Sequence, residues 1–183
     1  MNTLQKWLGP VLFCTCLGGG LTLGWSATTD LNKKRSSEVA VLQNALYDQE
    51  CGSCHFAYQP GWLPARSWDK IMTGLKDHFG ENATLAAEPQ RQLTDWLRVH
   101  AADHAQGGKI QKMVRSIPAQ ATPIRITEIP YFQKEHRKLP LRTWKENPQV
   151  RSLSHCATCH PQAKEGSFDE HAVRIPNFGP WKD

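Results

Sequence analysis

The 183-residue sequence has no long apolar run after residue 25, which excludes a protein that crosses a membrane several times. It also lacks a strong charge imbalance. The formal net charge is +5, and no basic stripe with interleaved aromatic residues indicates a nucleic-acid partner. Strand patterns are scarce, with residues 124–126 as the one short candidate. Hydrophobic residues make up 39% of the chain, so wholesale disorder is excluded and a globular fold is expected.

The N-terminal segment has the layout of a secretory signal peptide. Residues 8–25 are apolar, Lys6 precedes them, and a site of small residues ends at Ala27. An uncleaved membrane anchor is the alternative, but three consecutive glycines at 18–20 make a poor spanning helix. We therefore expect residues 1–27 to be removed during export to the periplasm, which leaves no membrane span.

The cysteines are confined to the signal segment and to two identical motifs. Cys14 and Cys16 lie in the first, and the other four belong to Cys-x-x-Cys-His at residues 51–55 and 156–160. No cysteine remains for an ordinary disulfide. This motif is the attachment pattern of c-type haem, in which two thiols bond the porphyrin and the histidine binds the iron. It predicts two covalent haem c groups, attached through Cys51, Cys54, Cys156 and Cys159, with His55 and His160 as iron ligands.

Two other uses of the motifs compete with haem. A structural zinc site would need both cysteine pairs, 105 residues apart, to converge, and it would leave the repeated histidine unexplained. A thioredoxin-like redox pair would need strand-rich flanks, which neither motif has. Export to an oxidising compartment also fits haem attachment better than zinc.

The flanks of the two motifs do not match, so we predict two unlike modules rather than a duplication. A flexible linker over 28–37 leads to a first module over 38–108, which ends at two glycines, and a second over 109–183 opens with a proline-punctuated stretch. Each has about 70 residues, a size at which a buried porphyrin supplies much of the missing core.

The fold class predicted is mainly α. Apolar residues recur at helical spacing in four segments: from Val39 to the first motif, from Trp68 to His78, after Thr84 as far as His100, and from Ile129 to His136. A helix that leads into a haem motif, with a closing helix later, is typical of a small class I cytochrome c. The first module is therefore expected to be class I-like, and the second to be irregular with short helices.

The second axial ligand of each iron decides between an electron carrier and a site open to small ligands. For the first haem the candidate is His78, on the apolar stripe of its predicted helix. His100 is the main rival, Met113 lies where a class I cytochrome carries its axial methionine, and His104 is expected to be solvated.

For the second haem the candidate is His136, which shares a helix face with Phe132. His171 is the rival, although the two acids before it suggest exposure. His155 directly precedes Cys156 and is too close to that attachment point to reach the opposite face of the same porphyrin.

Several segments resemble the dihaem cytochrome c family, often called DHC, over essentially the whole chain after the signal segment. They are residues 50–58, 60–68, 77–80, 135–137, the second haem motif, 168–170 and 173–176. The stretch from Pro60 to Trp68 is far more specific than a haem motif alone.

The resemblance implies bis-histidine ligation of both haems and supports His78 and His136, which lie inside matching segments. It also implies two redox partners, an oxygen-binding monohaem cytochrome and a membrane cytochrome b. We therefore expect a periplasmic, low-potential electron-transfer protein rather than an enzyme. The alternative is a haem enzyme or gas-binding cytochrome with one open or methionine-ligated iron.

Overall fold

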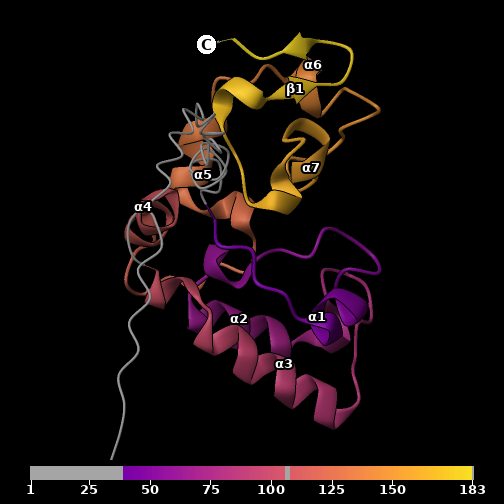
Figure 1. Ribbon diagram of the computed structural model, residues 1–183, viewed down its shortest axis with the longest axis vertical. Helices are drawn as coiled ribbons and strands as arrows, with labels where there is room; N and C mark the ends of the chain where they lie inside the picture. The colour runs from indigo at the N-terminus through magenta and orange to yellow at the C-terminus, as the bar shows by residue number, and fades with distance from the viewer. Residues whose placement is uncertain (1–38, 106–107, 183) are drawn as a thin grey trace, which may run out of the picture.

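The computed structural model describes residues 39–105 and 108–182; the predicted signal peptide and the whole of the predicted linker lie outside these ranges. Within them the chain is mainly helical, as predicted, with a single pair of very short strands (Figure 1). The α-helices are α1 (Ala45–Glu50), α2 (Ala65–Thr73), α3 (Ala87–Val99), α4 (Gly108–Ser116), α5 (Pro130–His136), α6 (Leu141–Trp144) and α7 (Cys156–Cys159). Short 3-10 turns include η3 (Leu75–Asp77) and η5 (Ile126–Glu128), and β1 (Arg174–Ile175) pairs antiparallel with β2 (Gly179–Pro180).

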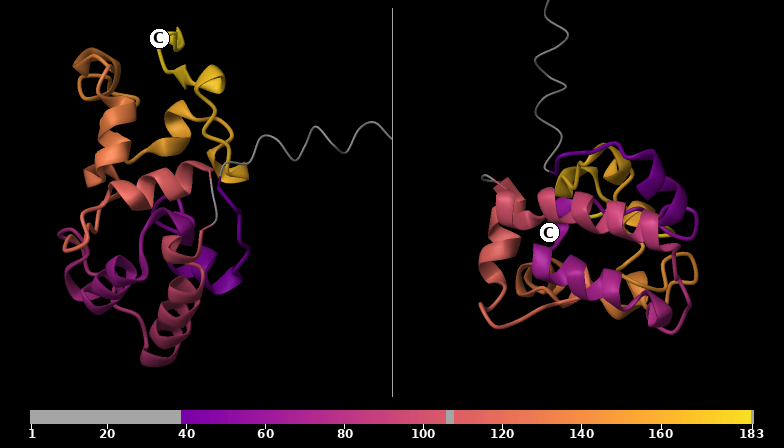
Figure 2. Two further views of the ribbon diagram at one scale, coloured as in Figure 1. Left: turned by 90° about the vertical axis from the view of Figure 1, so that its left-hand side faces the viewer. Right: turned by 90° about the horizontal axis from the view of Figure 1, so that it is seen from below.

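Helices α2 and α3 lie side by side and form the lower part of the molecule (Figures 1 and 2). Their apolar residues recur at helical spacing, so each helix turns one stripe inward. Trp68 and Met72 of α2 and Leu93 and Leu97 of α3 are buried. The indole N–H of Trp68 donates to the Pro60 carbonyl at 2.8 Å, which satisfies its one polar group.

One cluster of buried apolar residues extends from Val39 to Phe132 and includes Ile110 and Met113 of α4. The backbone N–H of Val39 also donates to the Gly166 carbonyl at 3.0 Å, so the start of the described chain is tied to its C-terminal part. The predicted module boundary at residue 108 coincides with the start of α4, and the division into two modules remains a prediction.

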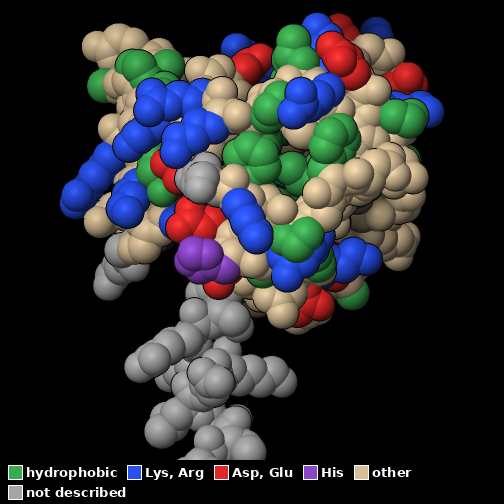
Figure 3. Space-filling model, turned by 90° about the horizontal axis from the view of Figure 1, so that it is seen from above, with side chains coloured by type: hydrophobic (Ala, Val, Ile, Leu, Met, Phe, Trp, Pro, Cys, Tyr) green, Lys and Arg blue, Asp and Glu red, His purple; other side chains and the backbone are tan. Residues whose placement is uncertain are grey.

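The C-terminal part, in the upper half of Figure 1, is built from short helices and turns, and hydrophobic side chains gather on the face of the molecule seen from above (Figure 3). The strands β1 and β2 form a tight hairpin, in which Asn177 adopts a left-handed φ of 68° and Gly179 one of 77°. Asparagine and glycine are the residues that tolerate such angles best. This hairpin was not predicted, because two-residue strands carry no periodic pattern.

The predicted helices are present, with two informative differences. The first begins at Ala45 rather than Val39, because the Asn44 side chain caps it by accepting from the Tyr47 N–H at 3.1 Å. The second ends at Thr73, so His78 follows the 3-10 turn η3 and does not lie on the helix stripe. The strand predicted over 124–126 is absent, and Ile126 begins the turn η5 instead.

Candidate metal centres

The first Cys-x-x-Cys-His motif follows α1 in a tight turn. The N–H of Cys51 donates to the Tyr47 carbonyl at 2.9 Å and closes the last helical turn. A Cβ on Gly52 would collide with the Asp48 carbonyl, so only glycine fits directly after Cys51. The turn therefore leads from the helix end through both cysteines to His55 within one compact loop.

His55 and His78 face each other across this site. Their rings are nearly parallel, with centroids 6.2 Å apart and an interplanar angle of 15°. Two imidazoles that bind one metal from opposite sides have centres about 6.2 Å apart, since a metal–nitrogen bond is about 2.0 Å and the ring radius is about 1.1 Å. Nδ1 of His55 lies 2.7 Å from the Phe56 carbonyl, which leaves Nε2 for a metal.

A tight turn fixes the backbone of His78. Its N–H donates to the Glu81 carbonyl at 2.7 Å, and the Glu81 N–H donates back at 3.2 Å. Phe79 and Gly80 both have positive φ, of 60° and 100°, as this reversal requires. The guanidinium of Arg125 lies 4.0 Å from the centre of the Phe79 ring, so the segment before η5 packs against the turn.

The pKa of His78 is lowered from its ordinary value, first by burial, then by the neighbouring His55 and by Arg125. The neutral imidazole is the form that binds a metal ion. The environment of His78 therefore favours the ligating state at neutral pH.

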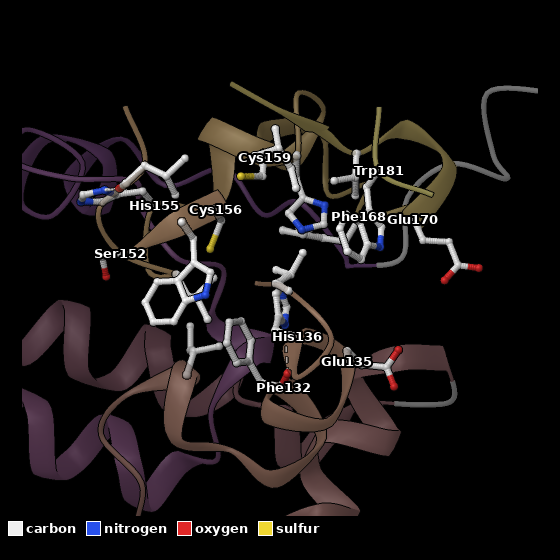
Figure 4. A pocket seen from close by; sticks show the side chains of 18 of the residues that line it. Phe132, Glu135, His136, Ser152, His155, Cys156, Cys159, Phe168, Glu170 and Trp181 are labelled. Carbon is white, nitrogen blue, oxygen red and sulfur yellow. Dashed lines mark hydrogen bonds between the residues drawn. The ribbon is translucent and has the colours of Figure 1, made fainter. Parts of the chain in front are cut away.

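The second motif forms α7 and lies on one wall of a cavity. Figure 4 shows the sulfur atoms of Cys156 and Cys159 on one side of this cavity, with His136 and Phe132 rising from the opposite side. The His136 and His160 ring centroids are 6.3 Å apart, again the spacing of two ligands on one metal, but the rings are tilted by 72°. The rest of the wall is largely apolar and aromatic, as a porphyrin requires; it includes Trp62, Met113, Leu139, Val150, Phe168 and Trp181.

His136, the last residue of α5, is held by its own helix. Its Nδ1 lies 2.9 Å from the Phe132 carbonyl, one turn earlier, and its ring stacks on the Phe132 ring with centroids 3.9 Å apart at 16°. Burial lowers its pKa, so the neutral form is again favoured. Its Nε2 remains free of this hydrogen bond.

His160 is partly buried, and its Nδ1 atom is buried without a hydrogen-bond partner among the described residues. Burial is the main cause that lowers its pKa to about 4, with smaller contributions from His136 and Lys109. A buried polar atom without a partner costs free energy, so such a ring is expected to gain from another interaction.

The four cysteines of the motifs are all free thiols. Burial raises the pKa of Cys51 and of Cys156 to about 11 each, the opposite of the low pKa of a reactive redox pair. In the described part of the chain, no three His, Cys, Asp or Glu side chains converge on a common point. The geometry therefore gives the zinc alternative no support, whereas thiols beside an apolar cavity fit haem attachment.

Of the other candidate ligands, only His155 and Met113 line the second cavity. His100 contacts the Trp96 carbonyl through Nδ1 at 2.8 Å, and His104 is exposed. His155 contacts the Val150 carbonyl at 2.7 Å, and His171 is 87% exposed beside Glu170. Met113, considered for the first haem, lines the second cavity.

Tyr58 connects the two sites. Its ring lies 5.4 Å from that of His55, its hydroxyl donates to the Ser154 carbonyl at 2.7 Å, and it lines the second cavity. Burial is the main cause that raises its pKa to about 12. Sequence reasoning did not single out Tyr58, and it placed Phe132 on the helix face of His136 without giving it a role at the site. The position of Phe132 four residues before His136 is the signal that could have found it.

Comparisons with known proteins identify the family of this chain. The family model for dihaem cytochrome c matches residues 47–168. A dihaem cytochrome c from Shewanella baltica OS155 is 38% identical, with a TM-score of 0.63, and the match covers 78% of this chain and all of the other. A dihaem cytochrome c from Rhodobacter sphaeroides is 37% identical, with a TM-score of 0.63, over 71% of this chain and all of the other. A search of curated protein sequences gives no match.

Within residues 39–105 and 108–182, no helix is long and apolar enough to cross a membrane. Each of the two matched structures is covered over its entire length, and the matched region contains both haem motifs. The chain therefore belongs to the dihaem cytochrome c family, whose members carry electrons on two covalently attached haem c groups.

Proposed function

We propose that this chain transfers electrons through two bis-histidine haems, with His55 and His78 binding the first iron and His160 and His136 the second. The observation that carries the proposal is the ring spacing, 6.2 Å in one pair and 6.3 Å in the other. In both pairs one histidine comes from a Cys-x-x-Cys-His motif and the other from a distant segment.

Two kinds of feature support this assignment, the contacts that orient the rings and the burial that keeps them neutral. Nδ1 of His55 and Nδ1 of His136 are each engaged by a backbone carbonyl, which orients the ring and leaves Nε2 available. The pKa values of His78, His136 and His160 are lowered mainly by burial, so these rings are neutral at neutral pH. A haem iron supplies one-electron redox chemistry, and the role of the chain is to hold two strong ligands at fixed positions.

Two histidine ligands per iron have functional consequences. A filled sixth position leaves no site for oxygen or peroxide, and histidine in place of methionine lowers the reduction potential. The protein is therefore expected at the low-potential end of cytochromes c. Tyr58, which contacts both sites, supports a short path between the haems.

The cellular setting and the partners rest on the family resemblance and on the N-terminal sequence. Residues 1–27 have the layout of a signal peptide, so the proposed compartment is the periplasm. A membrane cytochrome b is the proposed electron donor and a soluble oxygen-binding monohaem cytochrome the proposed acceptor. The first module is proposed to be class I-like.

Carbon monoxide tests the proposal, because it binds ferrous haem only where a coordination position is open or weakly filled. The holoprotein, fully reduced under anaerobic conditions, is mixed with carbon monoxide, and the visible spectrum is recorded over time. We expect no prompt change at either haem. A prompt shift that accounts for one haem would support the alternative of a gas-binding or methionine-ligated iron and overturn the bis-histidine proposal.

A further inference from the structure

The two histidine pairs share a spacing but differ in the relative orientation of their rings. The planes of His55 and His78 are 15° apart, whereas those of His136 and His160 are 72° apart. Both arrangements suit bis-histidine ligation, because rotating an imidazole about its metal–nitrogen bond does not alter the distance. The orientation is therefore a separate property of each site.

Different contacts hold the planes of the histidine rings at the two sites. At the second site the Phe132 ring lies against His136 at 3.9 Å and 16°, and the Phe132 carbonyl engages Nδ1 of the same histidine. At the first site, Phe79 lies next to His78 at 4.7 Å and a tilt of 58°, so it does not stack face to face. The stacked ring makes Phe132 the residue best placed to set a ligand plane.

The orientation of the rings controls the electronic state of a low-spin ferric iron. Each imidazole donates π-electron density into the iron d orbital that is perpendicular to the ring. Two d orbitals of the iron can take part in this π interaction. Two parallel rings both act on the same one of them and separate its energy from that of the other. Two perpendicular rings raise both orbitals together and leave them nearly degenerate, so that orbital angular momentum is retained and the magnetic anisotropy becomes large.

We propose that the two haems are electronically inequivalent, the first a conventional rhombic low-spin centre and the second a strongly anisotropic one, with Phe132 as the residue that positions the His136 plane. This inference rests on the proposed bis-histidine ligation, but it concerns the ring planes and not the identity of the ligands. Each haem would then have a magnetic signature of its own.

Low-temperature electron paramagnetic resonance of the fully oxidised holoprotein tests the proposal. We expect two low-spin signals of equal spin count. One has three resolved g features, and the other has its largest g feature displaced to lower field. Two overlapping rhombic signals would overturn the inference and leave bis-histidine ligation intact. A high-spin signal that accounts for one haem would instead show that the proposed function fails.

The variant Phe132→Leu tests the positioning role and keeps the backbone carbonyl that engages His136. We expect the low-field feature to shift to higher field while the rhombic signal stays unchanged, because a released ring rotates away from the near-perpendicular orientation. The matched control is Phe79→Leu, which should leave the low-field feature where it is. A low-field feature that does not move in Phe132→Leu would reject the role of Phe132. The wild-type spectrum tests the orientation even if that variant does not fold.

Discussion

The hydroxyl of Tyr58 donates a hydrogen bond to the carbonyl of Ser154, with 2.7 Å between the two oxygens. Tyr58 lies three residues after His55 and Ser154 two residues before Cys156, so this one bond joins the two haem motifs across 96 positions of sequence. The proximity of the haem sites therefore has a specific anchor in the protein.

Removing this hydroxyl tests the anchor. Tyr58→Phe should lower the free energy of unfolding by about 1 kcal/mol, the net contribution of an ordinary hydrogen bond plus the loss of a partner for the carbonyl. Denaturant unfolding at neutral pH measures the change. Ser154→Ala keeps the accepting carbonyl but loses the hydroxyl contact with Ser152 at 2.6 Å, so it measures that contact and not the Tyr58 bond. An unchanged stability in Tyr58→Phe would show that the contact is energetically neutral.

The same tyrosine predicts a dependence on alkaline pH. Burial is the main cause that raises the pKa of Tyr58 to about 12, from the ordinary value of about 10 for tyrosine. The unfolded chain therefore loses this proton at a lower pH than the folded one, and the contribution of Tyr58 to stability is full below about pH 10 and declines towards pH 12. Unfolding free energies measured across this window should fall less in Tyr58→Phe than in the wild type. Equal declines would contradict the assignment.

Haem attachment predicts a simple result by intact mass. The wild-type holoprotein should carry two haem groups. Replacing Cys51 and Cys54 by alanine should remove one, and replacing Cys156 and Cys159 should remove the other, because each pair supplies both thioether bonds of its porphyrin. A double variant that retains both haems covalently would contradict the assignment of that pair.

The distal ligands predict a change of spin state. His78→Ala and His136→Ala should each convert one six-coordinate low-spin haem to a high-spin one, seen in the visible and paramagnetic resonance spectra of the oxidised protein. His100→Ala and His171→Ala are the controls, since one ring contacts the Trp96 carbonyl and the other is 87% exposed. A low-spin spectrum that persists in His78→Ala would reassign the first ligand.

The core of the helix pair makes a prediction about stability alone. Leu97 is fully buried on α3, so Leu97→Ala should lower the free energy of unfolding by about 2–5 kcal/mol through lost apolar contact and a residual cavity. Val99, two residues along, is 65% exposed, and Val99→Ala should change stability by less than about 0.5 kcal/mol. Thermal or denaturant unfolding of the holoprotein distinguishes the two variants, and equal effects would contradict the packing of α3.

Much of this architecture could be predicted from the sequence, because the haem motif is a strict pattern and the helices α3 and α5 carry clear apolar stripes. The prediction of His78 as a ligand had a less direct basis. It was placed on a helix stripe, but α2 ends at Thr73, and a turn with positive φ at Phe79 and Gly80 holds the histidine instead. Apolar residues recur at helical spacing beyond Thr73, so the pattern does not show that the helix ends there and a turn begins.

Other features of the sites could not be predicted from the pattern. Helix α4 carries Ile110 and Met113 between lysines and an arginine, so its buried stripe is narrow. The link from Tyr58 to Ser154 joins residues 96 positions apart, and the 72° tilt of His136 against His160 depends on how two separate elements pack. Such properties arise from tertiary packing, which local sequence patterns do not predict.

The most direct test of the central claim is a crystal structure of the haem-loaded protein, in which the distance from each distal histidine nitrogen to its iron is measured. Bis-histidine ligation predicts that Nε2 of His78 and Nε2 of His136 each lie about 2.0 Å from an iron, the length of a metal–imidazole bond. An iron bound instead by Met113, by another histidine or by no protein group on its distal side would contradict it.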